Sequence, residues 1–146
     1  MIAIVYQPID VSAVLREASH DSSGASVLFL GSVRDHGEKG AVSEIYYEAY
    51  LEMAEDALRK IEHYVIEHWN LLGFVTIQRL GLLKVGEVSV AIAVSSEHRK
   101  EAFEACSYVI DAIKQSVPVW KKEISAAGSR WVEGVMLEDN KEDGYV

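Results

Sequence analysis

The sequence predicts an α+β fold with a mainly antiparallel sheet and flanking helices. Apolar, β-branched segments are joined by hairpin-length connections, and a few helical patterns lie between them, which favours this class over a doubly wound sheet. The 146 residues, 49% of them hydrophobic, suffice to bury the core of one domain. No internal repeat or linker divides the chain, so we expect a single domain over residues 1–146.

The first third of the chain is expected to begin with a strand followed by a helix. Residues 2–6 are apolar and β-branched, and Asp10 is a suitable N-cap for a helix over 11–19. Residues 25–31 are apolar on both faces, which is typical of a central buried strand. The charged, glycine-rich segment 32–40 is expected to be a loop.

The middle third predicts three strands and a long helix. The segment 44–50 has strand composition, and apolar residues recur with helical spacing over 51–69, opposite a solvated face of paired charges. Gly73 is expected to end this helix. Residues 74–81 predict the next strand, and a short LLKVGE connection leads to a strand over 87–94 with one heavier and one lighter face.

The last third predicts another long helix and two short strands. The pair Ser95-Ser96 is expected to cap a helix that ends before Pro118, because proline forces the preceding residue out of helical geometry. Strand-like pieces at 119–124 and 130–135 lie on either side of an AAGS turn. Residues 136–146 are expected to form a polar, frayed tail.

Composition and charge narrow the classes of function. With 23 acidic against 14 basic residues and a net charge of −9, the chain offers no wide basic face for nucleic acid. No apolar run approaches the roughly 20 residues that span a bilayer, and the N-terminus lacks the features of a signal peptide. We therefore expect a soluble, cytoplasmic protein that binds neither nucleic acid nor membrane.

Cys106 is predicted to be a buried, inert thiol. A helical wheel places it at the centre of an apolar stripe formed by Phe103, Cys106, Ile110, Ile113 and Val117. A thiol in apolar surroundings has a raised pKa and poor access, the reverse of what a nucleophile or persulfide carrier requires. As the single cysteine, it excludes an intrachain disulfide and fits a reducing compartment.

Two lysines are candidates for chemistry. Lys114 ends the long helical pattern and Lys121 follows the helix-breaking Pro118, so two amines come close together without an obvious acidic partner. In an acidic chain this pair indicates a small anionic ligand. Alternatively, the stem of Lys114 packs while its amine reaches solvent. In an extended segment Lys121 and Lys122 point to opposite sides, so at most one of them shares a pocket with Lys114.

A second candidate anion site lies at the start of the same helix. His98 and Arg99 oppose the helix dipole there, and an arginine beside free backbone N–H groups can bind phosphate. Alternatively, Glu97 and Glu101 simply neutralise these cations.

Weaker signals come from one arginine and from the histidines. Arg34 follows a strand end in a glycine-rich loop, where substrate-orienting groups are common, but Asp35 is an equally good ion-pair partner for it. His63 and His68, at i,i+5, do not share a helix face, so no metal site is expected. The chain has no GxSxG, Walker or GxGxxG motif.

Five segments, in order, resemble the molybdopterin synthase catalytic (large) subunit family between about Gly31 and Trp131. They are GSVRDHG at 31–37, YEAYLEMA at 47–54, RLGLLKVGE at 79–87, SSEHRKEAF at 95–103 and DAIKQSVPVWKKE at 111–123. The resemblance implies an α/β-hammerhead fold with antiparallel sheet. It also implies a sulfurtransferase of molybdenum cofactor biosynthesis, which converts cyclic pyranopterin monophosphate into molybdopterin by adding two dithiolene sulfurs.

The resemblance further implies the partners of the chain. The sulfur donor is expected to be the C-terminal thiocarboxylate of a small ubiquitin-like subunit, and two large subunits are expected to form the central homodimer of a heterotetramer. The substrate is a pterin, and no cofactor or metal bound by this chain is expected.

Site residues follow from the resemblance position by position. Lys114 and Lys121 are implied to be catalytic. The implied substrate-binding residues are Ser32, Val33, Arg34, His98, Arg99, Lys114, Lys121, Lys122 and Glu123, with His98 and Arg99 expected to hold the phosphate and pterin. Gln78 departs from the family pattern, in which histidine is common before the arginine of the RLG segment, so neither Gln78 nor Arg79 is assigned a role.

The length of the last helix predicts a pocket shared between two chains. Arg99 and Lys114 are fifteen residues apart, about 22 Å along the axis at about 1.5 Å per residue. One small pterin would hardly meet both from one helix, so His98 and Arg99 are expected to come from the other chain of a homodimer. Two other functions stay open: a non-catalytic dimeric module that binds a phosphorylated metabolite, and a sulfurtransferase that uses its own Cys106.

Overall fold

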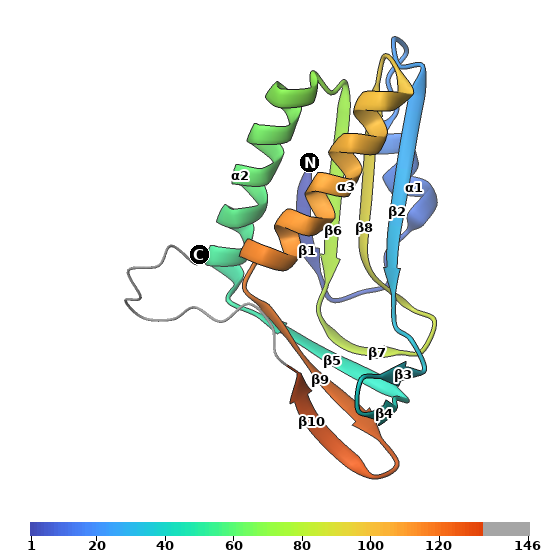
Figure 1. The fold of residues 1–146 in the computed structure, drawn as a ribbon, viewed down its shortest axis with the longest axis vertical. Coiled ribbons are helices and arrows are strands. Elements are labelled where there is room, and N and C mark those ends of the chain that lie inside the picture. The colour runs from blue at the N-terminus through green and yellow to red at the C-terminus, as the bar shows by residue number, and fades with distance from the viewer. Residues whose placement is uncertain (133–146) are drawn as a thin grey trace.

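The computed structural model of the chain describes residues 1–132, which form three helices, two four-stranded sheets and a two-stranded hairpin (Figure 1). The upper sheet in this view has the strand order β1-β6-β8-β2, with β1 (Ile2–Val5), β6 (Gly73–Arg79), β8 (Val88–Ser96) and β2 (Ala25–Ser32). β1 pairs with β6 in parallel, and the other two pairings are antiparallel. Helices α2 (Leu51–Trp69) and α3 (Arg99–Ser116) cover one face of this sheet, and α1 (Val11–Ala18) covers the other.

The lower sheet is wholly antiparallel and has the strand order β10-β9-β5-β7. Its strands are β10 (Gly128–Val132), β9 (Val119–Ser125), β5 (Glu44–Ala49) and β7 (Gly81–Lys84), and the small hairpin β3 (His36–Gly37) with β4 (Gly40–Ala41) lies beside it. β5 leads into α2, and α3 leads into β9, so two of the connections between the sheets pass through these helices. The predicted α+β class with a mainly antiparallel sheet is confirmed.

The main core lies on both faces of β8. Val90, Ile92 and Val94 are buried against α2 and α3, whereas Ala91 and Ala93 are buried against α1. The small side chains on the second face let a short helix pack close to the sheet. The two-faced strand predicted from the alternation of large and small residues is therefore confirmed.

Local signals predicted the beginning of α1 and the end of α3 correctly. The Oδ1 atom of Asp10 accepts a hydrogen bond from the backbone N–H of Ala13 at 3.1 Å, as an N-cap does. α3 ends at Ser116, and Val117 adopts extended geometry with φ −87° and ψ 121° before Pro118. The turn at this proline sends β9 back below the helix (Figure 1).

β2 is an edge strand of the upper sheet, not the central strand predicted over residues 25–31. Within the described residues it pairs with β8 alone. Val27 and Phe29 nevertheless pack against the core below α2 and α3, and Leu28 packs against the core below α1. Both faces of β2 are apolar because helices cover both sides of the sheet, and not because strands flank it.

Two predicted helix boundaries are wrong. α2 ends at Trp69, its C-cap Asn70 has a left-handed φ of 54°, and Gly73 instead begins β6. Glycine is needed at position 73 because a Cβ there would lie 2.0 Å from the carbonyl oxygen of Ala18. Ser95-Ser96 belongs to β8 and does not cap α3: the Ser95 hydroxyl donates to the Ala18 carbonyl and the Ser96 hydroxyl to the His98 carbonyl, each at 2.6 Å.

The buried face of α3 is displaced from the predicted stripe. Phe103 is 62% exposed. The buried residues of this helix are Ala102, Ala105, Cys106, Val109 and Ile113. Two alanines on this face let the helix approach the sheet, and a stripe drawn through large side chains alone misses them. Cys106 is buried, as predicted.

Segments predicted as connections carry short strands. The LLKVGE segment contains most of β7, which pairs with β5, and the segment 32–40 contains β3 and the start of β4. The predicted strand over 130–135 corresponds to β10, whereas residues 133–135 and the predicted tail 136–146 lie outside the described residues. No helix of residues 1–132 is long and apolar enough to cross a membrane.

Candidate active site

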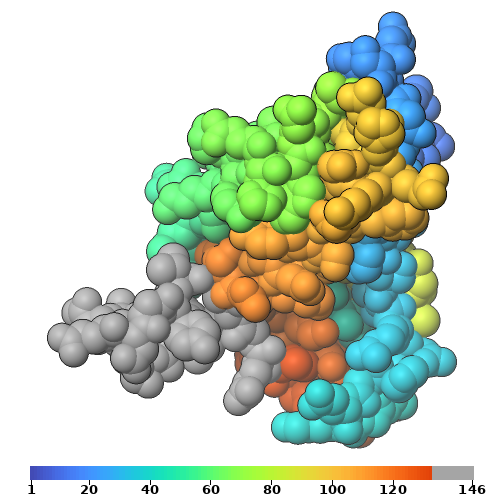
Figure 2. Space-filling view, turned by 45° about the horizontal axis from the view of Figure 1, so that its top comes forward, coloured from blue at the N-terminus to red at the C-terminus, as the bar shows by residue number. Residues whose placement is uncertain are grey.

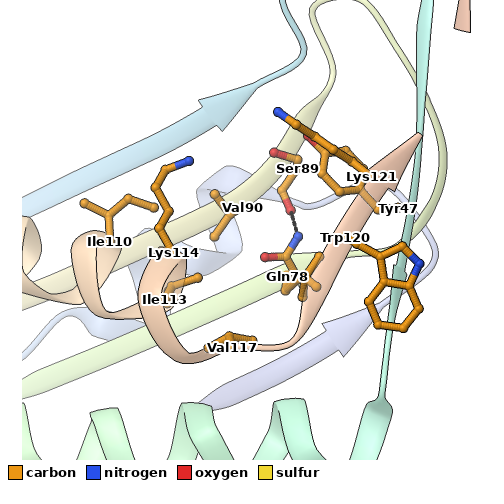
Figure 3. Close-up of a pocket in the computed structure, with 11 residues that line it drawn as sticks. Tyr47, Gln78, Ser89, Val90, Ile110, Ile113, Lys114, Val117, Trp120 and Lys121 are labelled. Carbon is orange, nitrogen blue, oxygen red and sulfur yellow. Dashed lines mark hydrogen bonds between the residues drawn. The ribbon is translucent and has the colours of Figure 1, made fainter. Parts of the chain in front are cut away.

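A cavity of about 290 Å³ lies below the C-terminal end of α3, where the two sheets meet (Figure 3). Polar side chains reach it from five elements: Tyr47 on β5, Gln78 on β6, Ser89 on β8, Lys114 on α3 and Lys121 on β9. Its apolar lining includes Ile110, Ile113, Val117 and Trp120. We call this space the lysine cavity. Its residues come from distant parts of the sequence, so only folding brings them together.

The two lysines reach the lysine cavity from either side of the turn at Pro118. Lys114 is in the last turn of α3, and Lys121 is the third residue of β9. The surface is recessed between the last turns of α3, the strands β9 and β10, and the 31–41 segment (Figure 2). The expected proximity of two amines thus has a geometric cause, which is the return of the chain below its own helix.

The surroundings of Lys121 favour its neutral form. Burial lowers the pKa of this amine, and the positive charges of Lys114 and, to a smaller extent, Arg34 lower it further. The carboxylate of Glu123 opposes these effects without cancelling them. Lys121 therefore has an amine that releases its proton more readily than an ordinary surface lysine does.

A second, wider space adjoins the lysine cavity at Lys121. This charged hollow has a volume of about 540 Å³ and is lined by Arg34, Lys39, Lys121, Glu123, Arg130 and Trp131, among others. Because Lys121 lines both spaces, its amine is accessible from two directions. Besides Lys121, three cations and two acids, Glu38 and Glu123, line the hollow, so positive charge is in excess and the hollow suits an anionic group.

Glu123 is the buried acid of the charged hollow. Its side chain is 10% exposed, and its Oε2 atom lies 3.5 Å from Nη2 of Arg130 across the β9–β10 pair. The β3–β4 hairpin packs directly on this carboxylate, because a Cβ added to Gly37 would lie 2.5 Å from Glu123 Oε1. A side chain at position 37 would therefore displace the carboxylate from its ion pair with Arg130.

Neutral hydrogen-bonding groups form another wall of the lysine cavity. The Ser89 hydroxyl donates to the Gly31 carbonyl at 3.2 Å. Burial raises the pKa of Tyr47, with a smaller opposing effect from its hydrogen bond with Ser89 and a slight further increase from Glu123. Tyr47 is therefore a neutral phenol at physiological pH, and the polar groups on this side of the cavity carry no charge.

The other predicted site residues on the strand and loop before β3 fall in different places. Arg34 lines the charged hollow, whereas the Val33 side chain is buried in a separate small core with Val42 and Leu83. Ser32 is exposed at the end of β2 and lines neither space. Asp35 contacts His36 at 2.7 Å, and no ion pair joins it to Arg34.

The remaining predicted residues lie away from the lysine cavity. The Lys122 amine lies 5.4 Å from the centroid of the Trp131 ring, so its side chain is directed differently from that of Lys121. His98 and Arg99 are exposed at the N-terminal end of α3, the opposite end from Lys114. Within residues 1–132, no ion pair neutralises either of them.

Sequence reasoning assigned no role to several side chains that line these spaces. They include Gln78, Tyr47, Ser89, Trp120 and Arg130. Tyr47 is opposite Lys121 in the β5–β9 register, and the indole N–H of Trp120 donates to Glu48 at 3.2 Å. No short-range pattern marks these residues, because strand pairing between distant segments brings them to the site. Residues 1–132 also contain no group of three His, Cys, Asp or Glu side chains arranged to hold a metal ion.

Comparisons with known proteins concern the sequence and the fold of the chain. Residues 4–116 match the family described as MoaE protein. The chain is 37% identical over 135 residues to a molybdopterin synthase catalytic subunit of Pyrococcus abyssi, covering 91% of each sequence. The crystal structure of molybdopterin synthase from Staphylococcus aureus superposes with a TM-score of 0.84 at 38% identity, covering 89% of this chain and 95% of that one.

The same fold occurs in a further, more distant structure. A protein–protein complex of subunits 1 and 2 of molybdopterin-converting factor from Helicobacter pylori contains a chain with a TM-score of 0.76 and 20% identity, over 90% of both chains. The resemblance inferred from the five sequence segments is confirmed by the relatives of higher identity. The chain therefore belongs to the MoaE protein family, to which the match with the Pyrococcus abyssi molybdopterin synthase catalytic subunit also points.

Proposed function

We propose that this chain converts cyclic pyranopterin monophosphate into molybdopterin by adding two dithiolene sulfurs. The observation that carries the proposal is that Lys114 and Lys121 line one cavity together with neutral hydrogen-bonding groups. The relatives named molybdopterin synthase support it. The reaction needs a sulfur donor, a site for an anionic pterin, and groups that move protons as the carbon–sulfur bonds form.

The sulfur comes from a partner and not from this chain. Cys106 is 4% exposed, and burial raises the pKa of its thiol to about 11. A thiol in this state neither attacks a substrate nor carries a persulfide at physiological pH. The C-terminal thiocarboxylate of a small ubiquitin-like subunit is the donor that we propose.

The two lysines have different roles in the proposed reaction. Lys121 has a lowered pKa, which suits proton transfer or a transient covalent bond to the acyl group of the donor. Lys114 stabilises the negative charge that develops as the acyl–sulfur bond breaks. Arg34 and the other cations of the charged hollow hold the carboxylate-like end of the donor next to Lys121.

The charged hollow is the proposed entrance for the donor terminus. It is wider than the lysine cavity and adjoins it at Lys121, so an extended peptide end can reach the amine while the pterin occupies the smaller space. The Helicobacter pylori structure of the same fold is a complex of two different subunits, which is compatible with such a partner.

The pterin phosphate is proposed to bind His98 and Arg99 of a second copy of this chain. α3 is one continuous helix from Arg99 to Ser116, so Arg99 and Lys114 are about 22 Å apart along its axis. Both residues at its N-terminal end are exposed and available to a neighbouring molecule. A homodimer that places this helix end beside the lysine cavity of its partner would complete the site.

Mixed dimers test the shared pocket. Lys114→Ala and Arg99→Ala proteins are each expected to be inactive, but a mixed dimer contains one pocket with both residues intact. After random exchange half of the dimers are mixed, so the mixture is expected to regain about a quarter of wild-type activity. If both residues serve a pocket within one chain, every pocket keeps one defect and mixing restores nothing.

The reaction itself is tested with purified components. The protein, the cyclic pterin and a small subunit with a thiocarboxylate terminus are mixed, and the dithiolene product is sought by mass spectrometry, with a carboxylate-terminated subunit as control. Lys114→Ala is expected to lower the rate about 100-fold or more while pterin binding stays within a few-fold. Unchanged turnover in Lys114→Ala would instead indicate a non-catalytic module that binds a phosphorylated metabolite.

A further inference from the structure

Gln78 is a buried amide whose orientation is fixed by the backbone. It lies on β6 in the wall of the lysine cavity and is 6% exposed. Its Nε2 atom donates to the Arg79 carbonyl at 3.2 Å and to the Ser89 carbonyl at 3.1 Å. Carbonyl oxygens can only accept, so the amide cannot be flipped without setting three oxygen atoms against one another.

The fixed orientation leaves one free group on Gln78. Both hydrogens of its amide nitrogen are engaged, and no hydrogen bond within residues 1–132 ends on its Oε1 atom. Oε1 is nevertheless not among the buried side-chain atoms that lack a partner, so it faces the cavity space. Figure 3 shows the dashed bond to Ser89 and the oxygen on the other branch of the amide.

The chemistry of this wall differs from that of the lysines. Lys114 and Lys121 present only donors to a ligand when protonated, whereas Gln78 presents an acceptor. Val117 and Ile113 lie around it, and no charged side chain other than the two lysines lines the cavity. A ligand that satisfies both kinds of group therefore has an anionic or carbonyl group at the lysines and an N–H donor at Gln78.

We propose that Gln78 is a specificity residue that accepts a hydrogen bond from the exocyclic amine of the bound pterin. This inference rests on the proposed function. The reacting carbons lie at the phosphate end of the substrate and face the lysines, while the phosphate itself binds His98 and Arg99 of the second copy. The aminopyrimidine ring is at the other end, and its exocyclic amine is the donor farthest from the phosphate. A heterocycle with an oxo group in place of that amine sets a carbonyl against Gln78 Oε1 and is rejected.

The experiment compares two ligands and two variants. Binding of the cyclic pterin and of its analogue with oxo in place of the exocyclic amine is measured by calorimetry for wild type, Gln78→Leu and Gln115→Leu. Gln115 is an exposed glutamine on α3, so it carries the same substitution outside the cavity. Wild type and Gln115→Leu are expected to prefer the amino ligand by about 10-fold or more, and Gln78→Leu is expected to bind the two ligands equally.

Turnover gives a second readout. In the sulfur-transfer assay Gln78→Leu is expected to raise KM for the pterin by about 3- to 10-fold, with kcat and KM for the thiocarboxylated donor close to wild type. A thermal melt identifies a variant that fails to fold, and in that case Gln78→Met, which keeps the length of the side chain but lacks its acceptor, replaces Gln78→Leu with the same expected loss of preference. Equal binding of both ligands by wild type, or a preference that survives in Gln78→Leu, overturns the role of Gln78. Wild type that binds the pterin but transfers no sulfur contradicts the proposed function instead.

Discussion

Gly37 offers a direct test of whether the position of the Glu123 carboxylate matters for activity. The backbone of Gly37 is not in the left-handed region, so alanine fits its conformation, and only the space beside it is limiting. The added Cβ would lie 2.5 Å from Glu123 Oε1, and ordinary contact begins at 3.4 Å. The carboxylate must therefore move away from the new Cβ by about 0.9 Å, because the packed backbone of β9, which carries Glu123, cannot move.

A displacement of this size in an active site costs about 100-fold in rate. Gly37→Ala is thus expected to lower kcat/KM for sulfur transfer about 30- to 100-fold, with a melting temperature close to wild type, as measured by product formation and by calorimetry. Ala41→Ser, on the exposed strand of the same hairpin, is the control and is expected to be fully active.

A second substitution shows whether the clash is the cause. Glu123→Asp shortens the acid by one methylene and removes the contact with the new methyl group, so Gly37→Ala is expected to have little further effect in that background. Independent, multiplicative losses in the double variant, or wild-type activity in Gly37→Ala alone, would refute the reasoning.

Three further outcomes are expected. The rate at which an amine-selective reagent acylates Lys121 should rise with pH at a midpoint below the ordinary lysine pKa of 10.5. Lys114→Met should move that midpoint upward, because a neighbouring positive charge is lost. Mass spectrometry of the labelled peptide measures both midpoints. Cys106→Ser should keep its activity and lose about 1 kcal/mol in urea unfolding, whereas inactivity would favour a sulfur-carrying thiol. Gly73→Ala should lose about 3 kcal/mol in the same unfolding assay, because its Cβ meets a backbone carbonyl at 2.0 Å, and an unchanged midpoint would contradict that packing.

The elements that sequence predicts well are those with local causes. The cap at Asp10 and the end of α3 before Pro118 depend on residues within one helical turn, and both are where the pattern places them. β7 and the edge position of β2 depend on pairing with distant strands, which periodicity does not reveal. Phe103 shows a third cause of error, since large apolar residues outweighed the two alanines that face the sheet.

The candidate site divides in the same way. Only six residues, one of them Pro118, lie between Lys114 and Lys121, so their proximity can be inferred from the chain alone. Tyr47 and Gln78 reach the lysine cavity through strand registers in two different sheets, and only the folded structure brings them together. Gln78 looked like a departure without a role, because the sequence cannot show that both of its amide hydrogens are already engaged.

Lys121 borders both the lysine cavity and the charged hollow, so the two ligands of the reaction share one titratable group. An anion that arrives on either side stabilises the ammonium form and draws a proton from the buffer. Association of the donor terminus should therefore show a heat that depends on the ionisation enthalpy of the buffer, and part of that dependence should vanish once the pterin is bound. Protonation of the Lys121 amine thus links the binding of one ligand to the affinity for the other.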